Sequence, residues 1–478
     1  MGSGTGRIVV KNITLEAAVD LLAMLRASVI SPMELAEEFI QQIERLNPTI
    51  NALVDFDPER IREQVRVAER STSPRGPLYG LPMTVKASIS TAGYRCETGS
   101  LLNRGHVPTE DAIVVSRMRR AGATLLGTTN CPEFLMAYET ENRLYGRTSN
   151  PWNLDYTAGG SSGGESAAVA AGLSACGVGS DSGGSVREPA HFTGICSLKP
   201  TPGRIPSAGH LAGSTGPFSI LGAIGPMART IKDVQLLFNT LSGHDEADPI
   251  GAPVPRRTLS LEDLKQYPIG VFEDDGLTPV TAETRQVVQA AAKALEDQGF
   301  QVRPYRPRSL ELARQLWLKF FVRCGLMLLE PMIKGREQEL STTFQGFLAI
   351  ARRDGSLNGD ELLEAWSQCD LVRAKLLEEM REFPILVCPV CAVPAFRHGE
   401  RSWTIDGQRI EYLDAMRYTV WFNLLGSPSA VVPVGSSPDG LPIGVQIAGR
   451  PFEDEVVLGI AAAVESAFGY IAPPIALG

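Results

Sequence analysis

The feature that most constrains the fold is a regular alternation of short apolar runs and helical segments through the middle of the chain. Gly80-Leu-Pro-Met-Thr-Val and Thr124-Leu-Leu-Gly predict buried strands, and a helix is expected between them over 112–121. An alanine-rich helix over 162–173 then leads into a further strand at Cys176-Gly-Val-Gly. Such alternation is typical of an α/β fold with a largely parallel or mixed sheet.

Helical segments dominate two other parts of the chain. Residues 1–70 are expected to be mainly helical, and Ser31-Pro-Met-Glu34 is a capping box with proline at the first helical position. A short helix is expected over 131–138. Residues 305–380 contain few turn signals and predict helices, which we expect to form a cap over a site. Strands are predicted again after this segment, and 454–468 closes the chain as a helix.

Composition excludes several function classes. The 478 residues are 44% hydrophobic and 21% charged, as in ordinary soluble domains, and the net charge is −9 with no long basic run. This balance argues against a nucleic-acid partner, because such binding needs a positive surface. No apolar stretch reaches the ~18 residues of a membrane span, and the N-terminus lacks a signal pattern. We therefore expect a cytoplasmic protein without a membrane partner.

The eight cysteines are scattered and do not suggest a disulfide framework. Cys388-Pro-Val-Cys391 is the single CxxC motif, and a zinc set would require a second cysteine or histidine pair. The apolar run Phe383-Pro-Ile-Leu-Val precedes it, so we interpret the motif as a buried strand end and expect no metal site.

The glycine- and serine-rich stretch from Gly159 to Pro200 carries the strongest functional signal. Ser161 and Ser185 lie in glycine-rich settings 24 positions apart (185 − 161), and Lys86 ends an apolar strand upstream. A buried lysine has a depressed pKa and can act as a base. Together these groups predict an acyl-transfer site that needs no histidine.

The chemistry and setting of each group suggest its role. Ser185 is the candidate nucleophile, Ser161 the hydroxyl that relays its proton, and Lys86 the base. The backbone amides of Ser182, Gly183, Gly184 and Ser185 can form a nest for an oxyanion. Glycines around Ser161 permit unusual backbone geometry, including a cis peptide bond.

An α/β-hydrolase elbow is the main alternative, because Gly159-Gly-Ser-Ser-Gly-Gly contains two overlapping Gly-x-Ser-x-Gly patterns. That elbow requires a strand directly before it, and 150–158 has the composition of a loop. It also requires a downstream histidine with a partner, and none of the five histidines has an obvious one. A phosphate-binding loop is less well supported, since no Gly-Lys-Ser/Thr follows.

At these motifs the chain resembles the amidase signature family. The resemblance is carried by Gly80-Leu-Pro-Met-Thr-Val-Lys, Gly127-Thr-Thr-Asn-Cys-Pro-Glu-Phe, Gly159-Gly-Ser-Ser-Gly-Gly-Glu, Ser180-Asp-Ser-Gly-Gly-Ser-Val-Arg and Gly440-Leu-Pro-Ile-Gly-Val-Gln-Ile. It implies a single amidase domain over 1–478 with its signature core at 80–240. The implied fold is a mixed sheet of roughly eleven strands covered by helices on both faces.

The resemblance also implies site residues. Ser185, Ser161 and Lys86 would form the Ser–cisSer–Lys triad, with Ser162 supporting Lys86 and no cofactor. Asp181 and Arg187 would brace the loop, and Leu135, Met136 and Tyr138 would lie near the substrate. Two positions depart from the family pattern: Ala87 and Ser88 follow the lysine where an acidic residue is common, and Ser180 replaces a common threonine.

The expected function is hydrolysis of small-molecule aryl or acyl amides, with esters and carbamates as further substrates. The alternative within the family is the glutaminase subunit of a transfer-RNA-dependent amidotransferase, and a non-catalytic binding scaffold is a third hypothesis. A homodimer is a possible assembly. Large apolar residues of 305–380, among them Trp317 and Phe321, are predicted mainly as core, with an apolar substrate pocket as the alternative.

Overall fold

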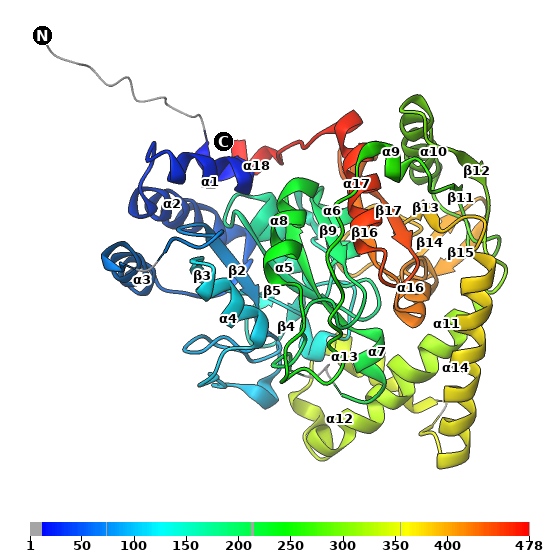
Figure 1. Ribbon diagram of the computed structural model, residues 1–478. Helices are drawn as coiled ribbons and strands as arrows, with labels where there is room; N and C mark the ends of the chain where they lie inside the picture. The colour runs from blue at the N-terminus through cyan, green and yellow to red at the C-terminus, as the bar shows by residue number, and fades with distance from the viewer. Residues whose placement is uncertain (1–11, 73, 212–214, 354, 478) are drawn as a thin grey trace, which may run out of the picture.

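An eleven-stranded mixed sheet lies at the centre of the computed structural model, which describes residues 12–72, 74–211, 215–353 and 355–477 (Figure 1). Its strands, in spatial order, are β1 (Leu53–Phe56), β3 (Thr124–Thr129), β2 (Pro82–Lys86), β8 (Cys176–Asp181), β10 (Ala223–Ala228), β9 (Cys196–Lys199), β16 (Ser429–Ser436), β17 (Pro442–Gly449), β13 (Ile385–Pro389), β11 (Ile269–Val271) and β12 (Val302–Pro304). β2 runs parallel to β3 and β8, and β8 begins an antiparallel series that continues to β13. The predicted mixed sheet is confirmed.

Helices cover both faces of this sheet. They are α1 (Ala18–Arg26), α2 (Pro32–Ile50), α3 (Pro58–Arg70), α4 (Ile113–Arg120), α5 (Gly163–Ala170), α6 (Arg187–Thr193), α7 (Pro217–Leu221), α8 (Ile231–Leu241), α9 (Leu261–Leu264), α10 (Ala282–Asp297), α15 (Tyr412–Ala415), α16 (Val420–Leu425), α17 (Asp454–Phe468) and α18 (Pro474–Leu477). Successive side chains of a strand point to opposite faces. In β16, Val431 packs with residues of α5 and α6, whereas Ala430 and Val432 belong to the core that includes α8 and α17.

The 305–380 segment is helical, as predicted. It contains α11 (Leu310–Leu318), a π-helical turn (Lys319–Cys324), α12 (Gly325–Ile333), α13 (Thr342–Arg353) and α14 (Gly359–Glu379). In Figure 1 these helices lie together, α11 and α14 beside α16. They pack in two apolar clusters distinct from the largest core cluster, and one of the two also contains Leu386 and Cys388 of β13.

Two local predictions are wrong. The segment before Gly159, expected as a loop, contains the strand β7 (Asn153–Thr157), which pairs with β6 (Ser149–Asn150) outside the central sheet. Asn150 pairs with Asn153, so Pro151-Trp152 closes a hairpin rather than opening a loop.

The second wrong prediction is the helix over 131–138. Only the 3₁₀ turn Glu133–Leu135 forms there. Phe134 and Leu135 have φ angles of 48° and 67°, and the amide of Phe134 bonds the carbonyl of Thr98 instead of a helical partner. Positive φ is incompatible with a right-handed helix.

The capping box predicted at Ser31 is confirmed. The Ser31 hydroxyl accepts from the Glu34 amide at 3.1 Å and the Glu34 carboxylate accepts from the Ser31 amide at 2.9 Å, so the capping box begins α2. All eight cysteines are free and buried, with Cys388 in β13 and Cys391 just beyond its end. Over the described ranges, no helix is long and apolar enough to cross a bilayer, and no cluster of three metal-ligating side chains occurs.

Further short elements complete the described chain. They are the 3₁₀ turns Ile13–Leu15, Leu101–Asn103 and Glu337–Glu339, and the strands β4 (Glu141–Asn142), β5 (Gly146–Arg147), β14 (Ser402–Ile405) and β15 (Gln408–Glu411), which form two small antiparallel pairs.

Candidate active site

Lys86 ends β2 in a fully buried position, because every residue of this strand packs inside the protein. Its Nζ donates to Ser161 Oγ at 2.7 Å and to Ser180 Oγ at 3.0 Å. Burial lowers the pKa of Lys86 to about 8, although Cys131, Asp181 and Glu165 oppose this shift. An amine with this pKa is partly neutral near physiological pH and can accept a proton from a hydroxyl.

Ser161 follows a cis peptide bond at Gly160 in the turn that leads into α5. Ser162, expected to support Lys86, instead donates to the backbone carbonyl of Ser180 at 3.3 Å and accepts from its amide at 3.3 Å. Ser180 therefore contributes the second hydroxyl at Lys86, and Ser162 holds the Ser180 backbone. One signal could have found Ser180: it lies, like Lys86, near the carboxyl end of one of two neighbouring parallel strands.

Ser185 lies in the turn between β8 and α6 and is half-buried. Its carbonyl accepts from the Ser162 amide at 3.1 Å, so the two glycine–serine segments are in direct contact. Ser185 lines a cavity of roughly 440 Å³. The structure thus brings the two glycine–serine segments into contact and places Lys86 against the first of them.

The backbone amides of the Ser185 turn are not equivalent. Gly184 donates to Asp181 Oδ1 at 2.8 Å and Val186 donates to Asp181 Oδ2 at 3.2 Å. The amide of Gly184, expected in the oxyanion nest, is therefore already used by a buried carboxylate that needs donors. Among the described residues, none accepts a hydrogen bond from the amides of Ser182, Gly183 and Ser185. Gly184 has a φ of 123°, which a side chain would not tolerate.

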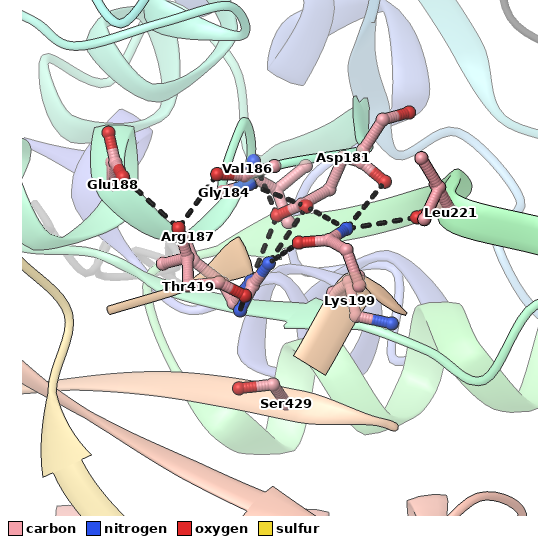
Figure 2. A network of polar contacts seen from close by, with 12 residues as sticks. Asp181, Gly184, Val186, Arg187, Glu188, Lys199, Leu221, Thr419 and Ser429 are labelled. Carbon is pink, nitrogen blue, oxygen red and sulfur yellow. Dashed lines mark hydrogen bonds and ion pairs between the residues drawn. The ribbon is translucent and has the colours of Figure 1, made fainter. Parts of the chain in front are cut away.

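Asp181 and Arg187 form a fully buried, two-pronged ion pair with both N–O distances at 3.0 Å (Figure 2). Burial alone would raise the pKa of Asp181, but Arg187 and a hydrogen bond from Asn423 outweigh it and hold the pKa below its usual range. Arg187 also donates to the carbonyl of Thr419 at 3.0 Å. Breaking such a pair costs about 3–5 kcal/mol, so it fixes the Ser185 turn firmly.

The carbonyls of the same turn are held by side chains. The carbonyl oxygen of Ser182 accepts a hydrogen bond from the indole N–H of Trp317 at 2.8 Å. The carbonyl oxygen of Gly183 accepts from the hydroxyls of Tyr138 at 3.2 Å and Thr419 at 2.7 Å. No sequence signal pointed to Trp317 or Thr419 in this role, because neither belongs to a local motif near Ser185.

The cavity is mainly apolar. Leu135, Met136 and Tyr138, which the resemblance places near the substrate, line it together with Trp317 and Phe321 of the 305–380 segment. Other large apolar residues of that segment, including Leu316 and Phe320, are buried in the cluster beneath. Residues of the segment therefore contribute both to a buried apolar cluster and to the cavity wall.

No histidine is among the described residues that line this cavity. His191 is buried, with both ring nitrogens in contact with backbone groups of Gly444 and Val393. His210 contacts Ser88 at 3.2 Å. This placement argues against an α/β-hydrolase elbow, which needs a histidine beside the serine.

Comparisons with known proteins identify related sequences and a related fold. A glutamyl-tRNA(Gln) amidotransferase subunit of Roseiflexus sp. (strain RS-1) is 34% identical over 468 residues, which cover 92% of this chain and 93% of that protein. Indoleacetamide hydrolase of Bradyrhizobium diazoefficiens is 31% identical, covering 95% and 87%. A solved structure of 6-aminohexanoate cyclic dimer hydrolase with substrate superposes with a TM-score of 0.84 at 28% identity, covering 97% and 99%.

The family model described as Amidase matches residues 34–458, which contain the lysine strand, both glycine–serine segments and β17. Sequence similarity over nearly the whole chain, the eleven-stranded fold and the family match point to one conclusion. The chain belongs to the amidase signature family.

Proposed function

We propose that the protein is a serine hydrolase that cleaves the C–N bond of small-molecule amides through an acyl-enzyme on Ser185. The observation that carries the proposal is the buried Lys86 amine, 2.7 Å from Ser161 Oγ, in a glycine–serine segment that contacts the segment of Ser185, which lines a cavity. A lysine held inside the protein with a serine partner has the chemistry of a base, whereas a structural lysine is usually solvated or paired with a carboxylate.

The proposed reaction moves one proton along this chain of groups. Ser185 Oγ attacks the substrate carbonyl carbon while its proton passes to Ser161 Oγ, whose own proton passes to Lys86 Nζ. The C–N bond then breaks as the proton returns along the same path to the leaving amine. Water attacks the resulting ester in the same way, which releases the acid and restores Ser185.

The negative charge on the carbonyl oxygen requires hydrogen-bond donors. The amides of Ser182, Gly183 and Ser185 are the candidates in this turn, since they donate to no described residue and Asp181 takes the amide of Gly184. Asp181 and Arg187 support the turn from inside the protein and do not touch the substrate in this proposal.

The substrate group beside the carbonyl is proposed to be apolar and aromatic. We propose that the 305–380 segment is a cap, since Trp317 and Phe321 complete the cavity wall together with Leu135 and Met136. The names of relatives, indoleacetamide hydrolase and 6-aminohexanoate cyclic dimer hydrolase, both denote amide cleavage. Esters and carbamates present the same carbonyl geometry and are proposed as further substrates.

The glutaminase role is the second candidate, favoured by the 34% identity to a glutamyl-tRNA(Gln) amidotransferase subunit. Free glutamine carries an ammonium and a carboxylate, and a mainly apolar cavity offers few partners for them. Activity on glutamine, especially with a co-purifying partner protein, would support this role.

A panel of substrates with one acyl part tests the proposal. We expect turnover of an aryl anilide, with the matching ester and carbamate also cleaved, and little turnover of glutamine. Release of product is followed by chromatography in each case. No turnover of any aryl substrate by the folded protein would contradict the proposed pocket.

The pH dependence of the reaction follows from Lys86. Because its pKa is lowered to about 8 and only the neutral amine accepts a proton, kcat/KM should rise with pH below 8 and level off above it. Steady-state rates from pH 6 to 10 measure this profile, with circular dichroism as the check on folding. A rate that falls between neutral and mildly alkaline pH would argue against Lys86 as base.

Glu165 is the control for this profile. It is buried, its carboxylate accepts from Thr84 at 2.5 Å and Thr129 at 2.8 Å, and burial raises its pKa to about 7. The Glu165 carboxyl titrates close to the pH range in which Lys86 titrates, and its negative charge raises the pKa of Lys86. Glu165→Gln removes the titration of this carboxyl, and the rise of kcat/KM with pH should remain in the variant.

A further inference from the structure

We propose that Trp317 is a positioning residue that holds the Ser182–Gly183 peptide group in the orientation needed for oxyanion binding. The inference rests on the proposed acyl transfer at Ser185. It gives the 305–380 segment a part in the chemical step, in addition to its place in the cavity wall.

The first observation is a hydrogen bond. Nε1 of Trp317 donates to the carbonyl oxygen of Ser182 at 2.8 Å, and the tryptophan is 4% exposed. In a trans peptide the carbonyl and the following N–H point in opposite directions. Holding the Ser182 carbonyl against the indole therefore directs the Gly183 N–H to the other side of the peptide group, and this amide donates to no described residue.

The second observation is close packing on the same residue. A Cβ atom at Gly183 would lie 2.5 Å from Cζ2 of Trp317, so the edge of the indole rests directly on the glycine. The next carbonyl, that of Gly183, is held by Tyr138 and Thr419. Two successive carbonyls of the turn are thus fixed by three side chains from distant parts of the chain, and Trp317 supplies the donor to the first.

The indole is itself held in place. Its ring stacks on Phe321 with centroids 4.6 Å apart and planes 11° from parallel. Phe321 lies in the π-helical turn that directly follows α11, and such turns occur frequently at functional sites. Both rings line the cavity, so a substrate group that packs there contacts the side chain that orients the turn.

Trp317→Phe tests the inference, because it keeps an aromatic ring and removes only the indole N–H and part of the ring. We expect kcat to fall about 10- to 100-fold for aryl and alkyl amides alike, with KM changed less than about threefold, since loss of an oxyanion donor costs about 10²–10³ and a displaced donor less. Phe347→Leu is the matched control: it removes another ring from the cavity wall, and we expect a raised KM for aryl substrates with kcat retained.

Inhibition by an arylboronic acid gives a second readout. Ser185 Oγ bonds to the boron atom as its proton passes through Ser161 to Lys86, and the boron becomes tetrahedral with a hydroxyl oxygen in place of the oxyanion. Trp317→Phe should raise the inhibition constant by about the factor by which it lowers kcat/KM. Gly183→Ala disturbs the same contact between the indole and the turn, because the added Cβ would displace the indole. It should lower kcat by a similar factor.

Opposite outcomes are distinguishable. Suppose that Ser185→Ala is inactive. A kcat of Trp317→Phe within twofold of wild type, or a change in KM alone, would then show that Trp317 only lines the cavity, which would overturn the inference. If Trp317→Phe does not fold, Gly183→Ala decides by the same criterion. A Ser185→Ala variant as active as wild type would instead reject the proposed function.

Discussion

Replacement of Ser185 by alanine is expected to lower kcat for amide hydrolysis by about 10⁴-fold or more, because the side chain that forms the acyl bond is lost. The substitution removes one oxygen from a half-buried position, so the fold should be unchanged. Steady-state rates on an aryl anilide, with thermal unfolding of both proteins, measure the two effects separately.

Covalent labelling provides the control for Ser185. An aryl sulfonyl fluoride should modify the wild-type protein once, with the mass added to the peptide that contains Ser185, and should leave Ser185→Ala unmodified. A label on another serine, or activity above about a tenth of wild type in the variant, would reject Ser185 as the nucleophile.

Lys86→Met is expected to lower kcat by about 10³-fold, the usual contribution of a general base, while thermal stability at pH 7 does not fall. The pKa of Lys86 is lowered to about 8 from 10.5, which means that the folded state disfavours its ammonium form. That penalty is present at neutral pH and fades as pH rises from about 8 toward 10.5. Methionine carries no charge and so avoids this penalty, but it loses the hydrogen bonds that Lys86 makes to Ser161 and Ser180.

Lys199→Met is the matched control. Lys199 is also fully buried, also ends a strand, and burial lowers its pKa to about 7, but its Nζ donates to the carbonyl of Pro200 and not to a serine. Its removal should leave kcat within a few fold of wild type. Equal losses in the two variants would show that a buried amine is needed for structure rather than for catalysis.

Local sequence patterns predicted most of the fold. Apolar runs such as Pro82–Lys86 became buried strands, the capping box at Ser31 began α2, and the helix over 454–468 was found with the bounds expected. These features depend on neighbours in sequence, which periodicity and capping chemistry describe well. The two wrong assignments, over 131–138 and 150–158, involve positive φ angles and a short hairpin that composition does not encode.

The candidate site was predictable only in part. The motifs identified Lys86, Ser161 and Ser185, and the structure places Lys86 and Ser161 in direct contact. The hydrogen-bond partners within that site were harder to predict. Ser180 rather than Ser162 contacts Lys86, and the Asp181 carboxylate accepts the hydrogen bond of the Gly184 amide. A motif shows which groups are close in sequence, but hydrogen bonds depend on directions that only the folded backbone fixes.

The sequence by itself determined the α/β class, because strand and helix periods are local properties. Its motifs predicted a lysine–serine site, and their resemblance to the amidase signature family implied the large sheet. The tertiary structure alone decided what surrounds that chemistry. Trp317 and Thr419 reach the carbonyls of the Ser185 turn from segments more than a hundred residues away. Such contacts follow from how the sheet and the 305–380 segment pack together, and no spacing within the chain records them.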